Sequence, residues 1–269
     1  MRAAPSRSLR GFRATVLGGG NAGRAFAAAL SARGARVRLW TRRSGQSLAR
    51  ASDGAELVLF CVRDDAIEAV ARELARVART PAVALHVSGY HGLAPLRPLA
   101  RAGFATGSIH PLVPLKGRRS APDLEGAWFA TAARGRAAAM ARRVIAGLGG
   151  RELRLPPGDS RKHAWHLACA FVANGAVSLF DLALEHAGPG ASQALAAMLE
   201  TVARRLAGGP RAALTGPAAR GEEEVVAGHL ALLRRRPRDA ELYRLLSLRL
   251  LALSDLPPRR RRAIARRLR

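Results

Sequence analysis

The chain has 269 residues, of which 49% are hydrophobic, and carries a formal net charge of +26 at pH 7. This length accommodates two compact domains, and the apolar fraction can build a sizeable core. We find no apolar stretch approaching the 18–20 or so residues that span a bilayer. The arginine-containing start, residues 2–13, is not followed by the apolar segment of a secretory signal. We therefore expect no membrane association.

The two cysteines, Cys61 and Cys169, both lie in apolar sequence. Isolated cysteines in such surroundings behave as small buried hydrophobic residues. They do not form the framework of paired cysteines that is typical of secreted proteins. We expect a reducing compartment, the cytoplasm.

The positive charge is concentrated in three segments, 2–13, 234–238 and 259–269, which hold 15 of the 45 basic residues and no acidic residue. Lys116 and Lys162 are the only lysines, so almost all of this charge is arginine. Apart from Phe12, no aromatic residue that could stack on bases is interleaved with these arginines. The pattern favours a solvated cationic surface. Association with nucleic acid through the arginine-rich C-terminus is a less favoured alternative.

Strand and helix patterns alternate through the first part of the chain. The residues expected to form strands are 13–18, 36–41, 57–62, 83–87, 106–110, 128–132 and 151–155. Helical periodicity is expected at 22–32, 66–77 and 137–147. This alternation predicts an α/β fold of Rossmann type, with a parallel sheet covered by helices on both faces.

The pattern changes at Pro156-Pro157-Gly158, after which strand patterns disappear and four helices are expected. The first runs over about 161–187, and the others begin near Ser192, Glu222 and Asp239. The predicted organisation is a Rossmann domain over 10–156, an all-helical domain over 157–256 and an arginine-rich tail over 257–269.

A glycine motif stands between the first expected strand and the first expected helix. The residues Gly18, Gly19, Gly20, Asn21, Ala22 and Gly23 fit the pattern Gly-x-Gly-x-x-Gly. In this context the first glycine makes a tight turn, the second lets a pyrophosphate approach the backbone, and the third lets the helix pack on the strand. The free N–H groups of the helix start would then bind the phosphates. The sequence predicts a dinucleotide site here.

The end of the second strand bears on the choice of cofactor. An acidic residue there would bind the ribose 2′-hydroxyl of NAD, whereas this chain has Thr41, Arg42, Arg43 and Ser44. A guanidinium group and hydroxyls suit the 2′-phosphate of NADP. The absence of an acid is the stronger indication, because arginine is abundant throughout the chain. We predict NADP over NAD.

Two histidine motifs follow expected strands, His86-Val87-Ser88-Gly89 and His110-Pro111. The carboxyl ends of parallel strands are where open α/β sheets bind ligands. Ser88 is therefore predicted to contact the cofactor or substrate, and His110 to line the nicotinamide side. No spaced set of cysteines or carboxylates accompanies them, so we predict no metal site.

Three polar residues of the expected long helix, Lys162, His166 and Asn174, fall within about 120° of one another on a helical wheel. Lys162 is unusual in a chain that otherwise uses arginine, and a partly buried lysine can lose its proton whereas arginine cannot. These three residues are predicted to be catalytic, with Lys162 as the proton donor. A solvent-facing lysine at a helix start is the alternative.

Taken together, these motifs resemble one uncharacterised bacterial family that joins a Rossmann-like N-terminal half to a helical C-terminal domain of unknown function. The remaining motifs on which the resemblance rests are Cys61-Val62-Arg63-Asp64-Asp65-Ala66-Ile67, Gly107-Ser108-Ile109-His110-Pro111, Trp165-His166 and Leu214-Thr215-Gly216-Pro217 with Arg220-Gly221. That family is similar to the 6-phosphogluconate dehydrogenase-like superfamily.

The resemblance implies hydride transfer with NADP(H), contacts of Cys61 and Val62 with the cofactor, and a homodimer formed through the helical domain. Two residues depart from the family pattern: Trp165 replaces the usual tyrosine, and Glu222 replaces the usual aspartate. We predict an NADP-dependent oxidoreductase that acts on a small carbonyl or imine. A non-catalytic NADP sensor or scaffold is the alternative, because a fold alone does not establish a reaction.

Overall fold

The computed structural model describes residues 9–117, 121–156 and 158–269. The chain divides into two compact units, Met1–Ala176 and Val177–Arg269. Helix α6, Asp159–Ala187, runs through the division between them. The sequence-based boundary at 156/157 falls just before this helix, whereas the two compact units divide within it. The predicted domain limits therefore stay a prediction.

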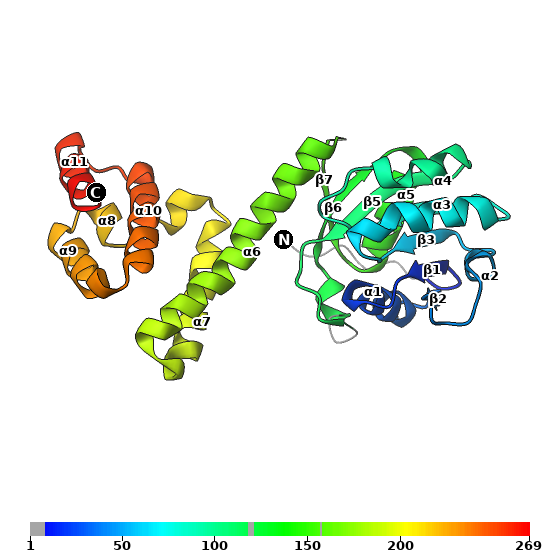
Figure 1. Ribbon diagram of the computed structural model, residues 1–269, viewed down its shortest axis with the longest axis horizontal. Helices are drawn as coiled ribbons and strands as arrows, with labels where there is room; N and C mark the ends of the chain where they lie inside the picture. The colour runs from blue at the N-terminus through cyan, green and yellow to red at the C-terminus, as the bar shows by residue number, and fades with distance from the viewer. Residues whose placement is uncertain (1–8, 118–120, 157) are drawn as a thin grey trace. The chain divides into compact units, whose positions relative to one another are not determined.

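The first unit is built on a seven-stranded sheet with the order β2-β1-β3-β4-β5-β6-β7 (Figure 1). The strands are β1 Arg13–Leu17, β2 Arg36–Trp40, β3 Leu57–Phe60, β4 Val83–His86, β5 Ala105–Pro111, β6 Trp128–Ala133 and β7 Arg151–Arg154. Its helices are α1 Asn21–Ala32, α2 Leu48–Ser52, α3 Ile67–Val77, α4 Arg97–Arg101 and α5 Gly135–Gly147. This confirms the predicted Rossmann-type fold.

One pairing differs from the all-parallel sheet that we expected, because β6 runs antiparallel to β5. Parallel neighbours need a crossover of a dozen or more residues, usually a helix. The connection from Pro111 to Trp128 includes the 3-10 helix Pro122–Leu124 but no α-helix among its described residues. The chain therefore returns beside β5, and β7 then pairs in parallel with β6.

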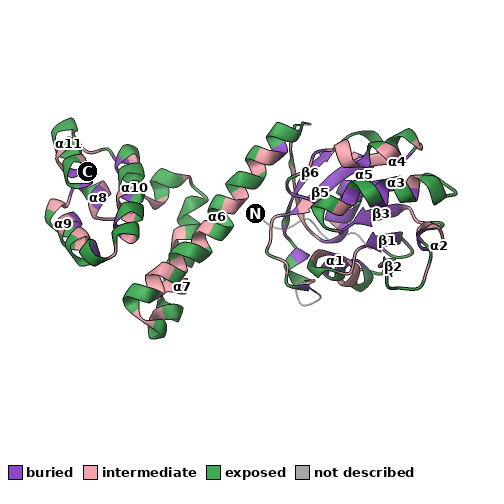
Figure 2. Cartoon of the chain, in the orientation of Figure 1, coloured by how far each residue is buried: buried purple, intermediate pink, exposed green. Residues whose placement is uncertain are grey.

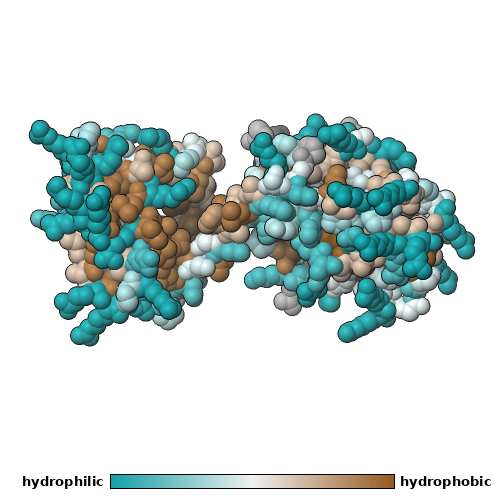
Figure 3. Space-filling view, turned by 45° about the horizontal axis from the view of Figure 1, so that its top comes forward, coloured by the Kyte–Doolittle hydropathy of each residue, from teal (hydrophilic) through white to brown (hydrophobic). Residues whose placement is uncertain are grey.

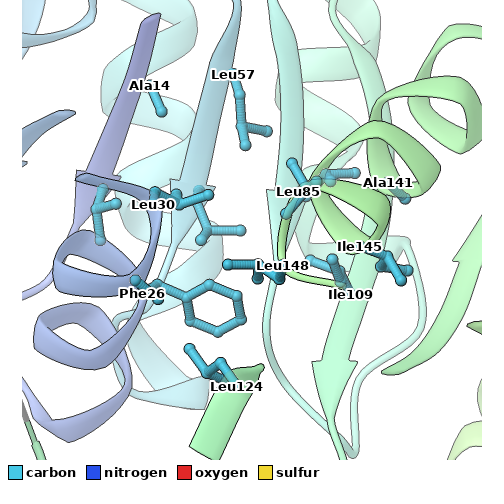
Figure 4. Close-up of a cluster of buried hydrophobic side chains, with 14 of the residues drawn as sticks. Ala14, Phe26, Leu30, Leu57, Leu85, Ile109, Leu124, Ala141, Ile145 and Leu148 are labelled. Carbon is cyan, nitrogen blue, oxygen red and sulfur yellow. The ribbon is translucent and has the colours of Figure 1, made fainter. Parts of the chain in front are cut away.

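The central strands β1, β3 and β4 are buried on both faces of the sheet, as their continuous apolar sequences require (Figure 2). Leu57 and Leu59 of β3 join the cluster under α1 and α5, whereas Val58 and Phe60 join the one under α2, α3 and α4. Figure 4 shows the first cluster, in which Phe26 of α1 lies among aliphatic side chains of the sheet and α5. This packing holds the carboxyl ends of the strands in fixed positions.

Helix α6 corrects an expectation from the sequence. Its 29 residues contain an 18-residue window of mean hydropathy 1.8, which is long and apolar enough to cross a membrane by length and composition alone. Asn174 and Asp181 interrupt the apolar run of this helix in the sequence, so no uninterrupted apolar stretch of that length is visible there. Lys162 is the one buried residue of α6. A helix that is apolar on most of its surface is buried either in a membrane or against other protein.

The second unit is all-helical among its described residues, as predicted. It contains the end of α6 together with α7 Ser192–Leu206, α8 Pro217–Arg220, α9 Glu223–Leu232, α10 Pro237–Leu253 and α11 Pro258–Arg267. Its core is small and consists of Ala218, Val226, Leu251, Ile264 and Leu268.

The arginine-rich C-terminus is part of this core and is not a solvated tail. Residues 258–267 form α11, in which Ile264 is fully buried, and Leu268 beyond it is 2% exposed. Ile264 and Leu268 are four residues apart and so lie on one face of the helix, whereas the arginines occupy the rest. Two apolar residues among so many arginines do not form a recognisable apolar pattern in the sequence.

Candidate functional site

The glycine loop has the geometry that its sequence predicts. Gly18 follows β1 with a φ of +113°, and a Cβ there would lie 2.5 Å from the carbonyl oxygen of Cys61. A Cβ at Gly23 would lie 1.8 Å from the carbonyl oxygen of Gly18. The first and third glycines are therefore required for the turn and for the packing of α1 on β1.

Gly20 differs from its neighbours because nothing lies within 4 Å of the position of a Cβ. It is the N-cap of α1, with extended backbone and no side-chain cap, so Asn21 and Ala22 begin a helix whose first N–H groups lack a capping side chain. Gly19 faces the methyl group of Thr41, at 2.8 Å from its own Cβ position. Open N–H groups at a helix start suit an anion such as a pyrophosphate.

The end of β2 forms a turn that presents two arginines. Ser44 closes the turn, with its amide and hydroxyl both donating to the carbonyl oxygen of Thr41 at 3.0 and 2.7 Å. Arg42 and Arg43 are exposed, and they have no ionic partner in the described parts of the chain. The Ser44 hydroxyl is thus used within the turn, and the two guanidinium groups are available for an anion.

Cys61 and Val62 follow β3 beside the glycine loop. The carbonyl oxygen of Cys61 occupies the space that a Cβ at Gly18 would need, and burial raises the pKa of the Cys61 thiol. Val62 packs on the edge of the apolar cluster under α3. The Cys61 thiol is therefore not a nucleophile at neutral pH, and both residues shape the wall beside the glycine loop.

Ser88 organises the loop after β4. Its hydroxyl donates to Oδ2 of Asp64 at 2.9 Å and accepts from the amides of Tyr90 and His91 at 3.1 and 3.0 Å. His86 is fully buried, and its Nε2 bonds the carbonyl oxygen of Gly92 at 2.8 Å. The Ser88 hydroxyl is thus occupied within the protein, and its predicted contact with the cofactor or substrate stays a prediction.

Lys162 is fully buried near the start of α6. Its Nζ donates to the carbonyl oxygen of Ser88 at 2.8 Å and to Oγ of Ser108 at 3.1 Å, which joins α6 to the ends of β4 and β5. Burial lowers the pKa of Lys162 to about 8, and the negative charge of Asp64 opposes this shift. The solvent-facing alternative for Lys162 is wrong.

Two histidines lie on either side of Gly89. A Cβ at Gly89 would lie 2.7 Å from Cδ2 of His166 and 2.8 Å from Cε1 of His110. Nδ1 of His110 bonds the carbonyl oxygen of Val87 at 3.0 Å, so it carries the proton and leaves Nε2 as the acceptor. Burial and the positive charge of Lys162 lower the pKa of His110. A side chain at position 89 would clash with both imidazole rings, so glycine is required there.

Asn174 does not join this cluster. It is exposed and lies twelve residues after Lys162 on the same helix, which corresponds to about 18 Å along the axis. The helical wheel projects residues along the axis and therefore hides this separation.

Sequence reasoning missed four participants: Asp64, Ser108, Tyr90 and His163. Asp64 and Ser108 lie within motifs already quoted for the family resemblance. Tyr90 stacks on His163 with ring centroids 3.9 Å apart. The sequence signal that could have found this pair is the concentration of histidines, since five of the seven lie in the segments 86–110 and 163–166.

The fold and the site together define a Rossmann-type protein with a glycine loop at the start of α1 and a polar cluster near the ends of β4 and β5. The polar cluster consists of Asp64, Ser88, Ser108, His110 and Lys162. Two family models match the chain: a Rossmann-like domain at residues 21–111 and a domain of unknown function, DUF2520, at residues 127–250. The chain therefore belongs to the proteins that join a Rossmann-like domain to a DUF2520 domain, as the resemblance predicted. No curated protein matches the chain in sequence.

Several solved structures share the fold. A provisionally assigned NADP oxidoreductase from Bacteroides fragilis is 22% identical, with a TM-score of 0.72 over 90% of this chain and 99% of that one. A protein from Thermotoga maritima is 19% identical, with a TM-score of 0.65 over 90% and 98%. A pyrroline-5-carboxylate reductase from Coxiella burnetii is 16% identical, with a TM-score of 0.59 over 91% and 99%.

Proposed function

We propose that this protein binds NADP(H) at Gly18–Gly23 and transfers hydride between the cofactor and a small carbonyl or imine substrate. The observation that carries the proposal is the glycine loop: two glycines are sterically required, and the one between them, Gly20, leaves the helix start open. This is what a bound pyrophosphate needs. The reductases among the solved structures of the same fold support the same reaction class.

The turn after β2 supports NADP over NAD. Arg42 and Arg43 stand where an acid would bind the ribose hydroxyls of NAD. Guanidinium groups form charge-assisted hydrogen bonds with phosphate oxygens, so the pair would hold the 2′-phosphate. When bound, the nicotinamide supplies or accepts the hydride.

The polar cluster would provide the positive charge that stabilises the reacting substrate and the proton that accompanies hydride transfer. The buried ammonium of Lys162 places positive charge at the ends of β4 and β5, where it would stabilise an oxygen or nitrogen anion that develops during reduction. A pKa of about 8 also lets Lys162 lose its proton near neutral pH. Nε2 of His110 would accept or orient a substrate proton, and Gly89 keeps that nitrogen uncovered.

The sensor or scaffold function is the second candidate, and one observation favours it. The hydroxyl of Ser88 and the ammonium of Lys162 both form hydrogen bonds within the protein. A protein that uses its polar groups to hold a loop could bind NADP(H) without chemistry. Binding of NADPH without turnover of any substrate would favour this function.

The central experiment is a fluorescence titration of NADPH and NADH, followed by a screen of keto acids and cyclic imines for NADPH oxidation. Gly20→Val is the sharpest variant, because the backbone and the free space at Gly20 accept a side chain that would block the phosphates. Gly190→Val is the matched control, since a Cβ at Gly190 also meets no atom. NADPH affinity should fall only in Gly20→Val. Unchanged NADPH affinity in Gly20→Val would contradict the proposal.

We also propose a homodimer formed through the helical part of the chain. In the second unit, Val177 of α6 is 71% exposed and Leu232 of α9 is 81% exposed. Figure 3 shows apolar side chains gathered on one face of the helical unit. A cavity of about 350 Å³ in the same unit is lined by leucines of α6, α9 and α10, among them Leu232. A second copy would cover this surface isologously. Analytical ultracentrifugation tests it, with Leu232→Asp expected to give a monomer.

A further inference from the structure

A second cavity lies outside the glycine loop, in the first unit. It has a volume of about 570 Å³ and is lined by α3, by α4 and the residues before it, and by the first turns of α6. Cavities of this size hold small-molecule ligands. None of the residues assigned above to the cofactor or to the proton lines it, so the proposed reaction does not account for it.

Three arginines from two helices meet at this cavity: Arg72 of α3, and Arg97 and Arg101 of α4. Arg72 forms an ion pair with Glu68 at 2.6 Å. The guanidinium groups of Arg97 and Arg101 have no ion pair or hydrogen bond in the described parts of the chain. They are four residues apart on one helix, where like charges repel each other. An anion between them would remove that repulsion.

The remaining walls set the chemistry of the ligand. Two carboxylates, Glu68 and Asp159, line the cavity, but Glu68 is already paired with Arg72. The rest of the wall consists of the stacked rings of Tyr90 and His163, together with His91, Ala94 and two prolines. The cavity thus combines two unpaired guanidinium groups with an aromatic and apolar wall, which suits an organic anion better than a cation.

We propose that this cavity binds a small organic anion that carries a carboxylate or phosphate group, held between Arg97 and Arg101. The site is separate from the glycine loop, so the inference goes beyond the proposed function and does not depend on it. Planar guanidinium groups bind carboxylate and phosphate oxygens bidentately, so both groups share the same recognition chemistry. The carbon skeleton of the ligand would lie against Tyr90 and His163.

The test is isothermal titration calorimetry of the full-length protein with succinate and, separately, with inorganic phosphate, at constant ionic strength. The variant R97Q/R101Q removes the two unpaired charges, and R76Q/R79Q removes two exposed arginines of the same unit that do not line the cavity. The affinity for the tighter of the two anions should fall about tenfold or more in R97Q/R101Q. It should stay unchanged in R76Q/R79Q.

Three results would overturn this inference: no binding of either anion by the unmodified protein, equal affinity in R97Q/R101Q, or an equal loss in the two double variants, which would indicate only general attraction to the cationic surface. Gly20→Val separates the two proposals. It should abolish NADPH binding and leave anion binding intact. Loss of anion binding in Gly20→Val would place the anion at the glycine loop and would also overturn the inference.

Discussion

The two units bury their apolar side chains to very different extents. The sheet unit has a core on each face, with large side chains such as Phe26, Phe60 and Phe129 fully enclosed. The helical unit has one small buried cluster, and α7 has no buried residue at all. Leu232 and Val177 are 81% and 71% exposed. The sheet unit therefore encloses its own core, whereas the helical unit leaves large apolar side chains exposed, which supports the proposed dimer.

The difference follows from how each unit encloses its side chains. In the sheet unit, alternate residues of one strand serve opposite faces, so a short run such as Leu57–Phe60 fills two layers. In the helical unit, each helix buries a narrow stripe and leaves the rest of its surface outside. The proposed functions divide in the same way. The glycine loop and the polar cluster, to which we assign the cofactor and the substrate, lie in the sheet unit, and the proposed dimer forms through the helical unit.

Deletion of residues 257–269 should have the largest effect on stability. It should unfold the helical unit and leave the sheet unit folded. It removes Ile264 and Leu268 from the five-residue core of the helical unit, and each such loss costs about 2–5 kcal/mol. Circular dichroism should show loss of helix, while NADPH still binds the sheet unit. The control R266Q/R267Q removes charge only and should keep the fold. An intact helical unit after the deletion would show that α11 is dispensable.

Lys162→Ala should slow hydride transfer by about 10²–10⁴-fold and leave NADPH affinity unchanged, if Lys162 supplies the proton. Lys162→Arg keeps the charge but cannot lose a proton, so it separates electrostatic stabilisation from proton transfer. Single-turnover oxidation of NADPH measures both. Wild-type rates in Lys162→Ala would show that Lys162 is not the proton donor. His110 would then be the next candidate, and His110→Gln would test it.

The stability of the sheet unit should depend on pH through Lys162. Its pKa is about 8 in the folded chain and 10.5 in the unfolded reference, so between these values the unfolded state binds more protons. Stability therefore rises with pH over this window, because the cost of the buried charge disappears as Lys162 becomes neutral. Urea unfolding at several pH values measures the slope. Lys162→Met should abolish it, and a slope that persists in Lys162→Met would assign it to another group.

Replacement of Arg42 and Arg43 by alanine should have the smallest effect. Each charge-assisted contact contributes about 1.5–3 kcal/mol, so the preference for NADPH over NADH should largely disappear. The dimer should be unaffected, since the change lies in the sheet unit. Tighter binding of NADH than NADPH by the unmodified protein would contradict the assignment of the cofactor.

Local sequence determined most of the sheet unit. The glycine spacing, the strand patterns and the helix starts depend on residues close together in the chain, and Gly18 and Gly23 have the steric roles that the motif assigns. The helical content after residue 158 was predicted for the same reason. The lysine at position 162 stood out by composition alone, before any contact of its side chain was known.

Only the tertiary structure showed the contacts between residues that are far apart in the sequence. The hydrogen bonds of Lys162 to Ser88 and Ser108 span 74 and 54 residues, so no window of sequence contains them. The same is true of Gly89, which is needed because His110 and His166 arrive from different elements. The antiparallel direction of β6 follows from the connection before it, which contains no α-helix among its described residues. The burial of Ile264 depends on packing against other helices, which the surrounding run of arginines does not indicate. Local spacing fixes backbone conformation, whereas the chemistry of a side chain is set by whichever distant groups the fold places beside it.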